Sequence, residues 1–221
     1  MFYNNPKYIE EVQKMLKDNY ELLKKGEIPK TFGGFRIPPF YGDVFYDKEY
    51  TDWRSIFSKS FGFPLISEDW VKPLAKWIGD RPCLEIMAGT GYLSYALGKY
   101  GVKIKATDNY SWDNYFKNFI NVERMDCFEA IKKYGKQVDF VICSWPYMDD
   151  TAALCLELMT QINPKCRMIY IGEDYGGCTA NDRFFDISTF QDIKGFNEAV
   201  MNYTRWEGIH DFIGLVKLNK E

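Results

Sequence analysis

A regular alternation of apolar and polar stretches begins near Pro82 and continues to residue 172. Strand-like stretches cover residues 82–87, 102–107, 138–143 and 166–172, and helical patterns lie between them at 91–100, 112–119, 127–134 and 150–162. The stretches FVICS and CRMIYIG are apolar almost throughout, which is typical of parallel strands that are covered on both faces. The pattern therefore predicts an α/β fold with helices on both faces of a mostly parallel sheet.

Three further strands complete the predicted sheet. A short strand is expected at 122–124, and two candidate strands, EAVMNYTRW (198–206) and HDFIGLVKL (210–218), follow near the C-terminus. Because the last two are only a few residues apart, we expect them to form an antiparallel hairpin. The predicted sheet then has seven strands.

The N-terminal third shows a different pattern. Apolar residues recur at helical spacing at Ile9, Val12, Leu16, Tyr20 and Leu23. They predict an amphipathic helix over 6–25 that ends near Gly26. Residues 29–64 are crowded with aromatics, glycines and prolines, so we expect irregular structure with short helical turns. A helix over 68–78 then leads into the first strand.

These patterns divide the chain into an N-terminal helix with an aromatic-rich cap (1–67) and a domain that carries the sheet (68–221). The cap is either an ordered covering of the domain or a lid and platform for a substrate. Its Phe35, Phe40, Tyr41 and Trp53 are interspersed with Lys30, Arg36 and Arg54. Such residues stack on a flipped or single-stranded base, or line a pocket for a small aromatic molecule.

Net charge and cysteine content exclude only a few classes of function. The 221 residues carry a formal charge of −3, which gives no global reason to expect duplex nucleic acid as partner, although a local basic groove remains open. The six cysteines form no C-x-x-C pair, so we expect reduced core thiols and no metal site. The N-terminus lacks the pattern of a secretory signal, and no apolar stretch approaches the roughly 20 residues of a membrane span. We expect a cytoplasmic protein without membrane contact.

The first strand runs into a glycine-containing turn. In LEIMAGTGYLS (84–94), Gly89-Thr90-Gly91 separates the strand from the next helix. A turn of this kind exposes backbone N–H groups and permits close approach at the C-terminal edge of a parallel sheet. It therefore predicts a site for a ligand that contains a nucleoside.

Two ligand classes fit this turn. Gly89-x-Gly91-x-x-Ser94 followed by Asp108 resembles the dinucleotide fingerprint, so a NAD-dependent oxidoreductase is one candidate. However, a dinucleotide brings its pyrophosphate against the turn, where the carboxylate of Glu85 would repel it. S-adenosylmethionine (SAM) brings an ammonium and a sulfonium instead, which a carboxylate complements.

At this point the sequence resembles the class I SAM-dependent methyltransferases, a Rossmann-like family whose first motif reads acidic-x-Gly-x-Gly-x-Gly. Glu85, Gly89 and Gly91 match the motif, and Met87 stands at its first glycine. The resemblance covers about residues 68–218 and includes the predicted order of elements. It implies SAM as cofactor, held by Glu85, Met87, Ala88, Gly89, Thr90, Gly91, Asp108, Asn109, Asp126, Cys127 and Ser144.

Within this set, two carboxylates have specific expected roles. Asp108, at the end of the second strand, is expected to accept from both ribose hydroxyls. The resemblance places Asp126 against the adenine. Asp126 equally suits a helix N-cap, and both roles can coexist.

The stretch Ser144-Trp145-Pro146-Tyr147 ends the fourth strand, where the SAM methyl group would lie. It resembles the Asp/Asn/Ser-Pro-Pro-aromatic motif of methyltransferases that act on exocyclic amines, with Trp145 in place of the first proline. The resemblance implies that Ser144 and a backbone carbonyl orient an amine while Tyr147 stacks on its ring, so a nucleobase is a candidate acceptor. Packing of Trp145 and Tyr147 in the core at the strand end remains the alternative.

A second alignment treats Trp145-Pro146 as the start of a Trp-Pro-Pro-like turn. With it, the chain resembles a set of uncharacterised methyltransferase-like proteins through Ile171-Gly172-Glu173, Gly176-Gly177 and Asp182-x-Phe184-Phe185. Because these proteins are uncharacterised, this resemblance does not identify a methyl acceptor.

The implied reaction is direct displacement on SAM by an amine or hydroxyl acceptor, either a small molecule or a nucleobase. Ser144, Pro146 and Tyr147 are expected to position the acceptor, and Asp149 or Glu173 to accept its proton. Glu173, Asp174 and Tyr175 are expected to face the cleft; a solvated loop with a helix cap at Asn181 or Asp182 is the alternative. His210, the only histidine, is expected to be structural.

Two further functions stay open beside the oxidoreductase. One is a protein of the same fold that binds SAM without catalysis. The other is a lyase or hydrolase that consumes SAM without methylating an acceptor. The oligomeric state is also open at this stage.

Overall fold

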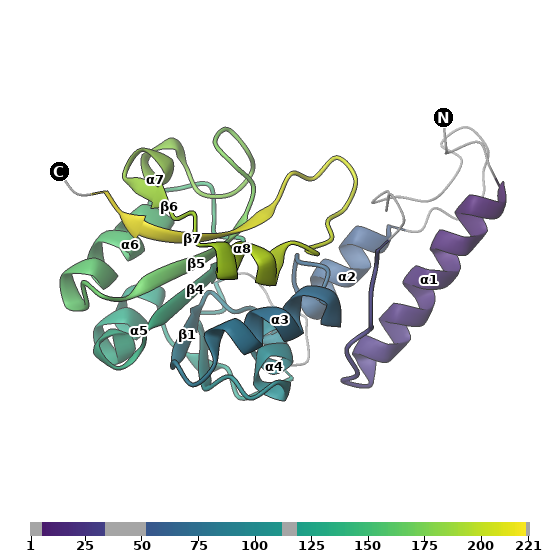
Figure 1. The fold of residues 1–221 in the computed structure, drawn as a ribbon, viewed down its shortest axis with the longest axis horizontal. Helices are drawn as coiled ribbons and strands as arrows, with labels where there is room; N and C mark the ends of the chain where they lie inside the picture. The colour runs from purple at the N-terminus through teal and green to yellow at the C-terminus, as the bar shows by residue number, and fades with distance from the viewer. Residues whose placement is uncertain (1–5, 34–51, 112–118, 220–221) are drawn as a thin grey trace.

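The structure is a computed structural model that describes residues 6–33, 52–111 and 119–219 (Figure 1). A seven-stranded sheet of order β3-β2-β1-β4-β5-β7-β6 forms its centre. The strands are β1 (Cys83–Ile86), β2 (Ile104–Asp108), β3 (Glu123–Arg124), β4 (Phe140–Ser144), β5 (Arg167–Gly172), β6 (Ser188–Phe190) and β7 (Phe212–Leu218). The strands β1 to β5 are parallel, and β7 runs antiparallel to both β5 and β6. The predicted Rossmann-like α/β fold is confirmed.

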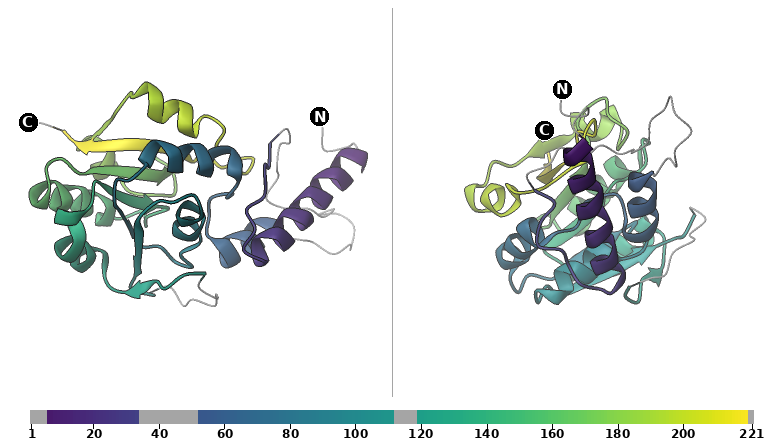
Figure 2. Two further views of the ribbon diagram at one scale, coloured as in Figure 1. Left: turned by 60° about the horizontal axis from the view of Figure 1, so that its bottom comes forward. Right: turned by 90° about the vertical axis from the view of Figure 1, so that its right-hand side faces the viewer.

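Helices cover both faces of this sheet (Figures 1 and 2). The described residues form the helices α1 (Pro6–Lys24), α2 (Trp53–Phe61), α3 (Glu68–Ile78), α4 (Tyr92–Lys99), α5 (Cys127–Tyr134), the 3-10 helix η2 (Gly135–Gln137), α6 (Thr151–Ile162), α7 (Asp182–Asp186) and α8 (Lys194–Val200). One face is covered by α3, α4 and α8, and the other by α5, α6 and α7. No helix in the described ranges is long and apolar enough to cross a bilayer.

Alternation along the central strands explains why their sequences are apolar almost throughout. In β4, Phe140 and Ile142 belong to the core under α3 and α4, whereas Val141 and Cys143 belong to the core under α5 and α6. Successive side chains of a strand point to opposite faces, and here both faces are buried. Such strands have no polar face.

Parallel pairing aligns the C-terminal ends of the central strands. Glu85 of β1 lies opposite Ala106 of β2 and Ile142 of β4. Ser144, at the end of β4, lies opposite Ile171 of β5. Residues that follow β1, β2 and β4 are therefore brought to one edge of the sheet, although they are far apart in the chain.

The N-terminal helix α1 lies beyond the end of the sheet and packs on α2 (Figure 1). Its Leu16 and Leu23 are fully buried, and Tyr20 meets three aromatic rings of α2 edge to face. The Tyr95 hydroxyl of α4 donates a hydrogen bond to the Gly26 carbonyl at 2.7 Å. The apolar residues of α1 and α2 are thus continuous with the core beneath α3 and α4. The division at residues 67 and 68 stays a prediction.

Most predicted elements are present, and one predicted strand is wrong. The expected strand at 198–206 is instead the end of α8 and the turns that follow it, and the antiparallel partner of β7 is β6 at Ser188–Phe190. Phe196 and Ala199 are buried at helical spacing, whereas Met201 is exposed. The antiparallel pairing of the last strand is therefore present, but its partner is β6, which was not predicted, and α8 lies between the two strands in the chain. The predicted helix at 112–119 lies almost entirely outside the described residues.

The burial of α1 predicts a large effect of truncating its central leucine. We expect Leu16→Ala to lower the free energy of unfolding by about 2–5 kcal/mol, because it removes a fully buried side chain. Urea unfolding followed by circular dichroism measures this change. The matched change Lys17→Ala, at an exposed position of the same helix, should alter stability by less than about 0.5 kcal/mol. Equal effects of the two substitutions would contradict the packing of α1.

Candidate functional site

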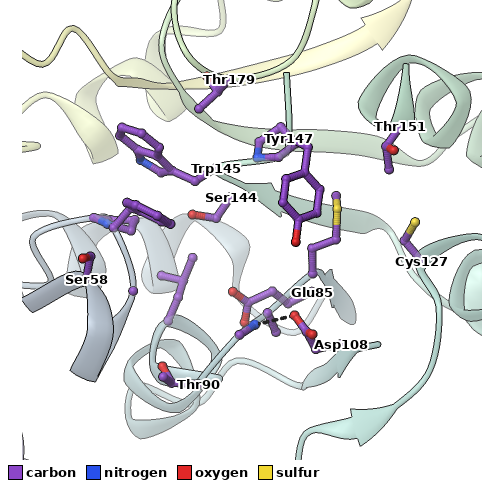
Figure 3. Close-up of a pocket in the computed structure, with 18 of the residues that line it drawn as sticks. Ser58, Glu85, Thr90, Asp108, Cys127, Ser144, Trp145, Tyr147, Thr151 and Thr179 are labelled. Atoms are coloured by element: carbon purple, nitrogen blue, oxygen red, sulfur yellow. Dashed lines mark hydrogen bonds between the residues drawn. The ribbon is translucent and has the colours of Figure 1, made fainter. Parts of the chain in front are cut away.

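A cavity of about 980 Å³ lies at the C-terminal edge of the sheet (Figure 3). Its wall on the sheet side consists of Glu85, Met87–Thr90, Asp108, Asn109, Asp126–Phe128, Ser144–Asp149 and Thr151. The opposite wall comes from α2 and the turn after it, between Asp52 and Pro64. The cavity brings together every predicted site residue except Gly91 and Glu173.

The turn after β1 has a left-handed backbone at three positions. Met87, Gly89 and Gly91 have φ angles of 53°, 54° and 70°. A glycine adopts this conformation freely, whereas a residue with a Cβ pays about 1–2 kcal/mol. Met87, at the position of the first glycine of the motif, therefore holds a strained backbone conformation.

The two glycines of the turn are required for different reasons. A Cβ on Gly89 would meet no atom within 4 Å, so this glycine opens directly onto the cavity. A Cβ on Gly91 would lie 2.6 Å from Val122 Cγ2 and 2.9 Å from Ile120 Cγ1. Gly91 thus serves the packing of α4 against the segment before β3, which explains why it does not line the cavity.

Glu85 is a buried carboxylate at the inner wall of the cavity. It is 2% exposed, and its Oε2 accepts hydrogen bonds from the Ser94 backbone N–H at 3.1 Å and from the Ser94 hydroxyl. Burial raises the pKa of Glu85 from 4.5 to about 7, although the bonds from Ser94 act in the opposite direction. A cation in the cavity would favour the ionised form. The site is therefore suited to a positively charged ligand.

Asp108 links the end of β2 to the glycine turn. Its Oδ2 accepts from the Gly89 N–H at 2.7 Å, and its Oδ1 accepts from the Tyr110 N–H at 2.6 Å (Figure 3). Each carboxylate oxygen has a second lone pair, so Asp108 can brace the turn and still accept from a ligand. The neighbouring Asn109 also lines the cavity, while its own Oδ1 accepts from the Ser111 N–H.

Asp126 and Cys127 line the cavity, and Cys127 lies on the same side of Ser144 as Asp108 (Figure 3). Asp126 Oδ1 accepts from the Phe128 N–H at 2.8 Å and caps α5. The helix cap considered from the sequence is therefore present. Because it uses one oxygen only, the cap leaves Oδ2 for a ligand in the cavity.

The segment after β4 combines a fixed indole with an exposed phenol ring. Trp145 has φ 52°, donates through Nε1 to Asp211 Oδ2 at 3.2 Å, and stacks on Phe63 with 4.7 Å between ring centroids. Tyr147, in contrast, is 41% exposed and faces the cavity. Core packing, the alternative considered for both residues, thus describes Trp145 in part but not Tyr147.

Glu173 does not line the cavity, contrary to expectation. Its Oε2 accepts from the Cys178 N–H at 2.8 Å and its Oε1 from the His210 N–H at 3.0 Å. Burial alone would raise the pKa of Glu173, but these hydrogen bonds outweigh it and hold the pKa below its usual value. With both oxygens engaged, the carboxylate anchors the loop.

The rest of this loop also differs from expectation. Asp174 and Tyr175 do not line the cavity; Cys178 and Thr179 do. Asn181 caps α7 by accepting from the Phe184 N–H, as the alternative interpretation of the loop proposed. A turn closed by a hydrogen bond of 2.8 Å from the Gly177 N–H to the Asp174 carbonyl follows β5, and the residues that reach the cavity come after this turn.

Only some of the residues that α2 contributes to the cavity are predicted from the sequence. Of the predicted cap residues, Arg54 lines the cavity, whereas Trp53 packs in the core and Lys30 lies elsewhere on the surface. Phe35, Arg36, Phe40 and Tyr41 lie outside the described residues. Ser55, Ser58 and Lys59 also line the cavity. Their spacing of three and four residues within one helix was the available signal, but α2 itself was not predicted as a helix.

No metal centre is visible among the described residues, where no group of three or more His, Cys, Asp or Glu side chains could hold an ion. The six cysteines are free, and all but Cys178 are buried. Cys127 is the buried thiol nearest the ligand space, since it lines the cavity.

No protein-family model matches the chain, and no curated protein matches its sequence. Among solved structures, the chain is similar to magnesium protoporphyrin IX methyltransferase (ChlM) from Synechocystis PCC 6803 with bound SAM, with 13% identity and a TM-score of 0.39 over 68% of this chain and 78% of that one. It is also similar to the mitomycin 7-O-methyltransferase MmcR, with 12% identity and a TM-score of 0.39 over 67% of this chain and 53% of that one.

A third similar structure is the M1A22 tRNA methyltransferase TrmK from B. subtilis, with 14% identity and a TM-score of 0.40 over 68% of this chain and 66% of that one. The chain therefore spans about half of the mitomycin enzyme and about two thirds of TrmK. At such identities the similarity concerns the fold alone, and the function depends on the residues of the site.

The different surroundings of the two glycines predict different costs of adding a methyl group. We expect Gly91→Ala to lower the free energy of unfolding by about 2–4 kcal/mol, through overpacking and backbone strain together. Gly89→Ala should cost only about 1 kcal/mol, because strain alone remains. Thermal or urea unfolding of both variants measures the difference. If Gly89→Ala were the more damaging change, the open space above Gly89 would be in doubt.

The raised pKa of Glu85 predicts a pH-dependent stability. A carboxyl group whose pKa is higher in the folded state stabilises fully below its unfolded pKa, and this contribution is lost as the pH rises through about 7. Glu85→Gln removes this dependence. We therefore expect the variant to gain stability relative to the natural chain between pH 4.5 and 8, by up to about 3 kcal/mol, since a tenfold change in proton affinity corresponds to roughly 1.4 kcal/mol. Urea unfolding at several pH values tests this, and a constant difference would contradict it.

Proposed function

We propose that the protein is a SAM-dependent methyltransferase that transfers the methyl group to an amine or hydroxyl acceptor by direct displacement. One observation carries the proposal. The carboxylates of Glu85, Asp108 and Asp126 line one cavity, and Ser144 and Tyr147 line the same cavity at the end of β4. A nucleoside ligand with a positive charge matches the first set, and a nucleophilic acceptor matches the second.

Charge favours SAM over a dinucleotide. Glu85 lies beside the turn that would hold a pyrophosphate, and in a buried position its carboxylate would repel that group strongly. The ammonium of SAM would instead pair with Glu85. The open space above Gly89 lets a ligand approach the backbone, so the residues present fit this donor.

Each donor-site residue then has a definite task. Glu85 binds the ammonium, and Asp108 accepts hydrogen bonds from the ribose hydroxyls while its bond to Gly89 keeps the turn in shape. Asp126 accepts from the adenine amino group through the oxygen that α5 does not use. When bound, SAM supplies a methyl group already activated by its sulfonium.

The acceptor side needs positioning more than acid–base power. Ser144 and Tyr147 orient the nucleophile in line with the methyl carbon, which forms a new bond as the bond from carbon to sulfur breaks. The proton of the acceptor passes to Asp149, which lines the cavity and whose Oδ1 accepts from the Thr151 N–H at 2.9 Å. Glu173 is not assigned this role, because it does not line the cavity. A nucleobase or a small aromatic amine fits these contacts.

Donor binding should depend on both carboxylates and on pH. We expect Asp108→Asn and Glu85→Gln each to weaken binding of SAM and of S-adenosylhomocysteine by about ten- to hundredfold, because each removes a charged partner. In the natural chain, affinity should rise with pH up to about 7 as Glu85 ionises, whereas Glu85→Gln should show no such rise. Isothermal titration measures both effects.

Asp80→Asn, at an exposed position away from the cavity, is the matched control and should leave affinity unchanged. Thermal unfolding of each variant checks that the glycine turn stays folded without the Asp108 charge. Unchanged donor affinity in both carboxylate variants would refute the proposed donor site.

The competing functions give different products. Mass spectrometry of reactions with SAM and a panel of amines and hydroxyls should detect S-adenosylhomocysteine together with a methylated acceptor. Loss of SAM without a methylated acceptor would indicate a lyase or hydrolase, and binding without turnover a non-catalytic protein. Binding of NAD(H) in preference to SAM would indicate an oxidoreductase.

A further inference from the structure

Arg54 is a cationic side chain that the proposed methyl transfer does not use. It lies in the first turn of α2, is half-buried and lines the cavity. Its guanidinium carbon lies 5.5 Å from the centre of the Trp145 ring. Since Trp145 follows Ser144 directly, Arg54 belongs to the part of the cavity where the acceptor would bind.

The Trp145 ring that Arg54 contacts is held in place by several contacts. The Trp145 indole stacks on Phe63 at an interplanar angle of 15°, and its Nε1 donates to the buried Asp211. The Trp145 backbone N–H donates to the Ile171 carbonyl at 2.7 Å. Contacts from three separate segments thus hold the ring. A cation over such a ring gains about 0.5–2 kcal/mol and is held near it.

Arg54 lacks a counter-charge within the described parts of the chain. No carboxylate there lies within ion-pair distance of its guanidinium. Asp52, its close neighbour, uses Oδ1 to cap α2 through the Ser55 N–H at 2.8 Å. Among the described residues that line the cavity, the other cation is Lys59, which is exposed. A half-buried guanidinium that forms no ion pair with a described carboxylate is well suited to bind an anion from solution.

The carboxylates of the cavity lie mainly on its other side. Figure 3 shows Asp108 and Cys127 on one side of Ser144 and Trp145 on the other. Glu85 and Asp108 carry their negative charge toward the donor, whereas Arg54 carries positive charge beside Trp145. The cavity therefore carries negative charge at the donor end and positive charge beside Trp145. This difference in charge would orient an acceptor that has an anionic group.

We propose that Arg54 binds an anionic group of the acceptor, a carboxylate or a phosphate, and so holds the acceptor with its nucleophile toward Ser144. This proposal rests on the proposed function, since it names the class of acceptor. The acceptor is then a small planar molecule with an amine or hydroxyl at one end and an anion at the other. The planar part would lie against the ring of Tyr147, which lines the cavity and is 41% exposed.

Matched pairs of probes test the preference for an anion. With the donor site saturated by S-adenosylhomocysteine, binding of 4-aminobenzoate is compared with 4-aminobenzamide, and cytidine 5′-monophosphate with cytidine. Each pair keeps its amine and differs in charge, and the two pairs separate a carboxylate from a phosphate. In at least one pair, we expect the anionic member to bind about tenfold more tightly, with an advantage that declines as salt is added.

Arg54→Gln should abolish this advantage, and Arg54→Lys should retain part of it because the charge remains. Lys76→Gln, which removes a positive charge from an exposed site on α3, should leave it unchanged. Equal affinity within both pairs, including no measurable binding of either member, overturns the proposal. So does an anion advantage that persists in Arg54→Gln.

A donor role for Arg54 would also overturn the proposal, and it can be distinguished directly. S-adenosylhomocysteine has an amino-acid carboxylate, whereas 5′-methylthioadenosine lacks it. If Arg54 held that carboxylate, Arg54→Gln would weaken binding of the first compound but not of the second. We expect both affinities to be unchanged. Failure of the natural chain to bind S-adenosylhomocysteine at all would instead refute the proposed methyltransferase function.

Discussion

Parallel pairing of β1 with β2 on one side and β4 on the other is the constraint on which the site depends. The registers Glu85 with Ala106 and Glu85 with Ile142 bring three strand ends to one edge. The hydrogen bond from the Gly89 N–H to Asp108 then joins two of these ends directly. Without this register, the acidic residues that follow separate strands would not line one cavity. The chemistry of the site is therefore a consequence of sheet topology.

Several energetically unfavourable features lie together at this C-terminal edge of the sheet. Met87 and Trp145 hold left-handed backbone conformations, and Glu85 is a buried carboxylate with a raised pKa. Each of these features would be avoided in a structural core, because strain or desolvation opposes folding. They persist here because packing and hydrogen bonds around them determine the conformation. Trp145, for instance, is held by Phe63, Asp211 and the Ile171 carbonyl.

The N-terminal region connects the fold to the acceptor end of the cavity. Tyr20 of α1 contacts Phe57 and Phe61 of α2, while Arg54 and Ser58 of the same helix line the cavity. One helix therefore takes part both in the hydrophobic core and in the wall of the site. Changes in the packing of α1 are expected to move the wall that would contact the acceptor, whereas the donor residues on the sheet would keep their positions.

Local patterns were sufficient to predict most elements. The apolar runs of β4 and β5 and the helical spacing in α1 and α3 depend on short-range periodicity, which is visible without any neighbour. The acidic residues and glycines near β1 and β2 were likewise recognisable, because a strand followed by a glycine turn places its residues at the sheet edge. The strand expected at 198–206 is wrong because β6, which lies earlier in the chain, pairs with β7 instead, and residues 198–200 belong to α8, which packs on α3.

What the sequence determined by itself was the βαβ series and the acidic character of the donor end, since both follow from residues close together in the chain. Only the tertiary structure decided which polar residues reach the cavity. Glu173 lies outside the cavity and accepts hydrogen bonds from two backbone N–H groups. Gly91 is required for close packing, whereas Gly89 is open to the cavity, and Arg54 lies over the Trp145 ring. These outcomes depend on contacts between distant segments, which no local pattern of residues encodes.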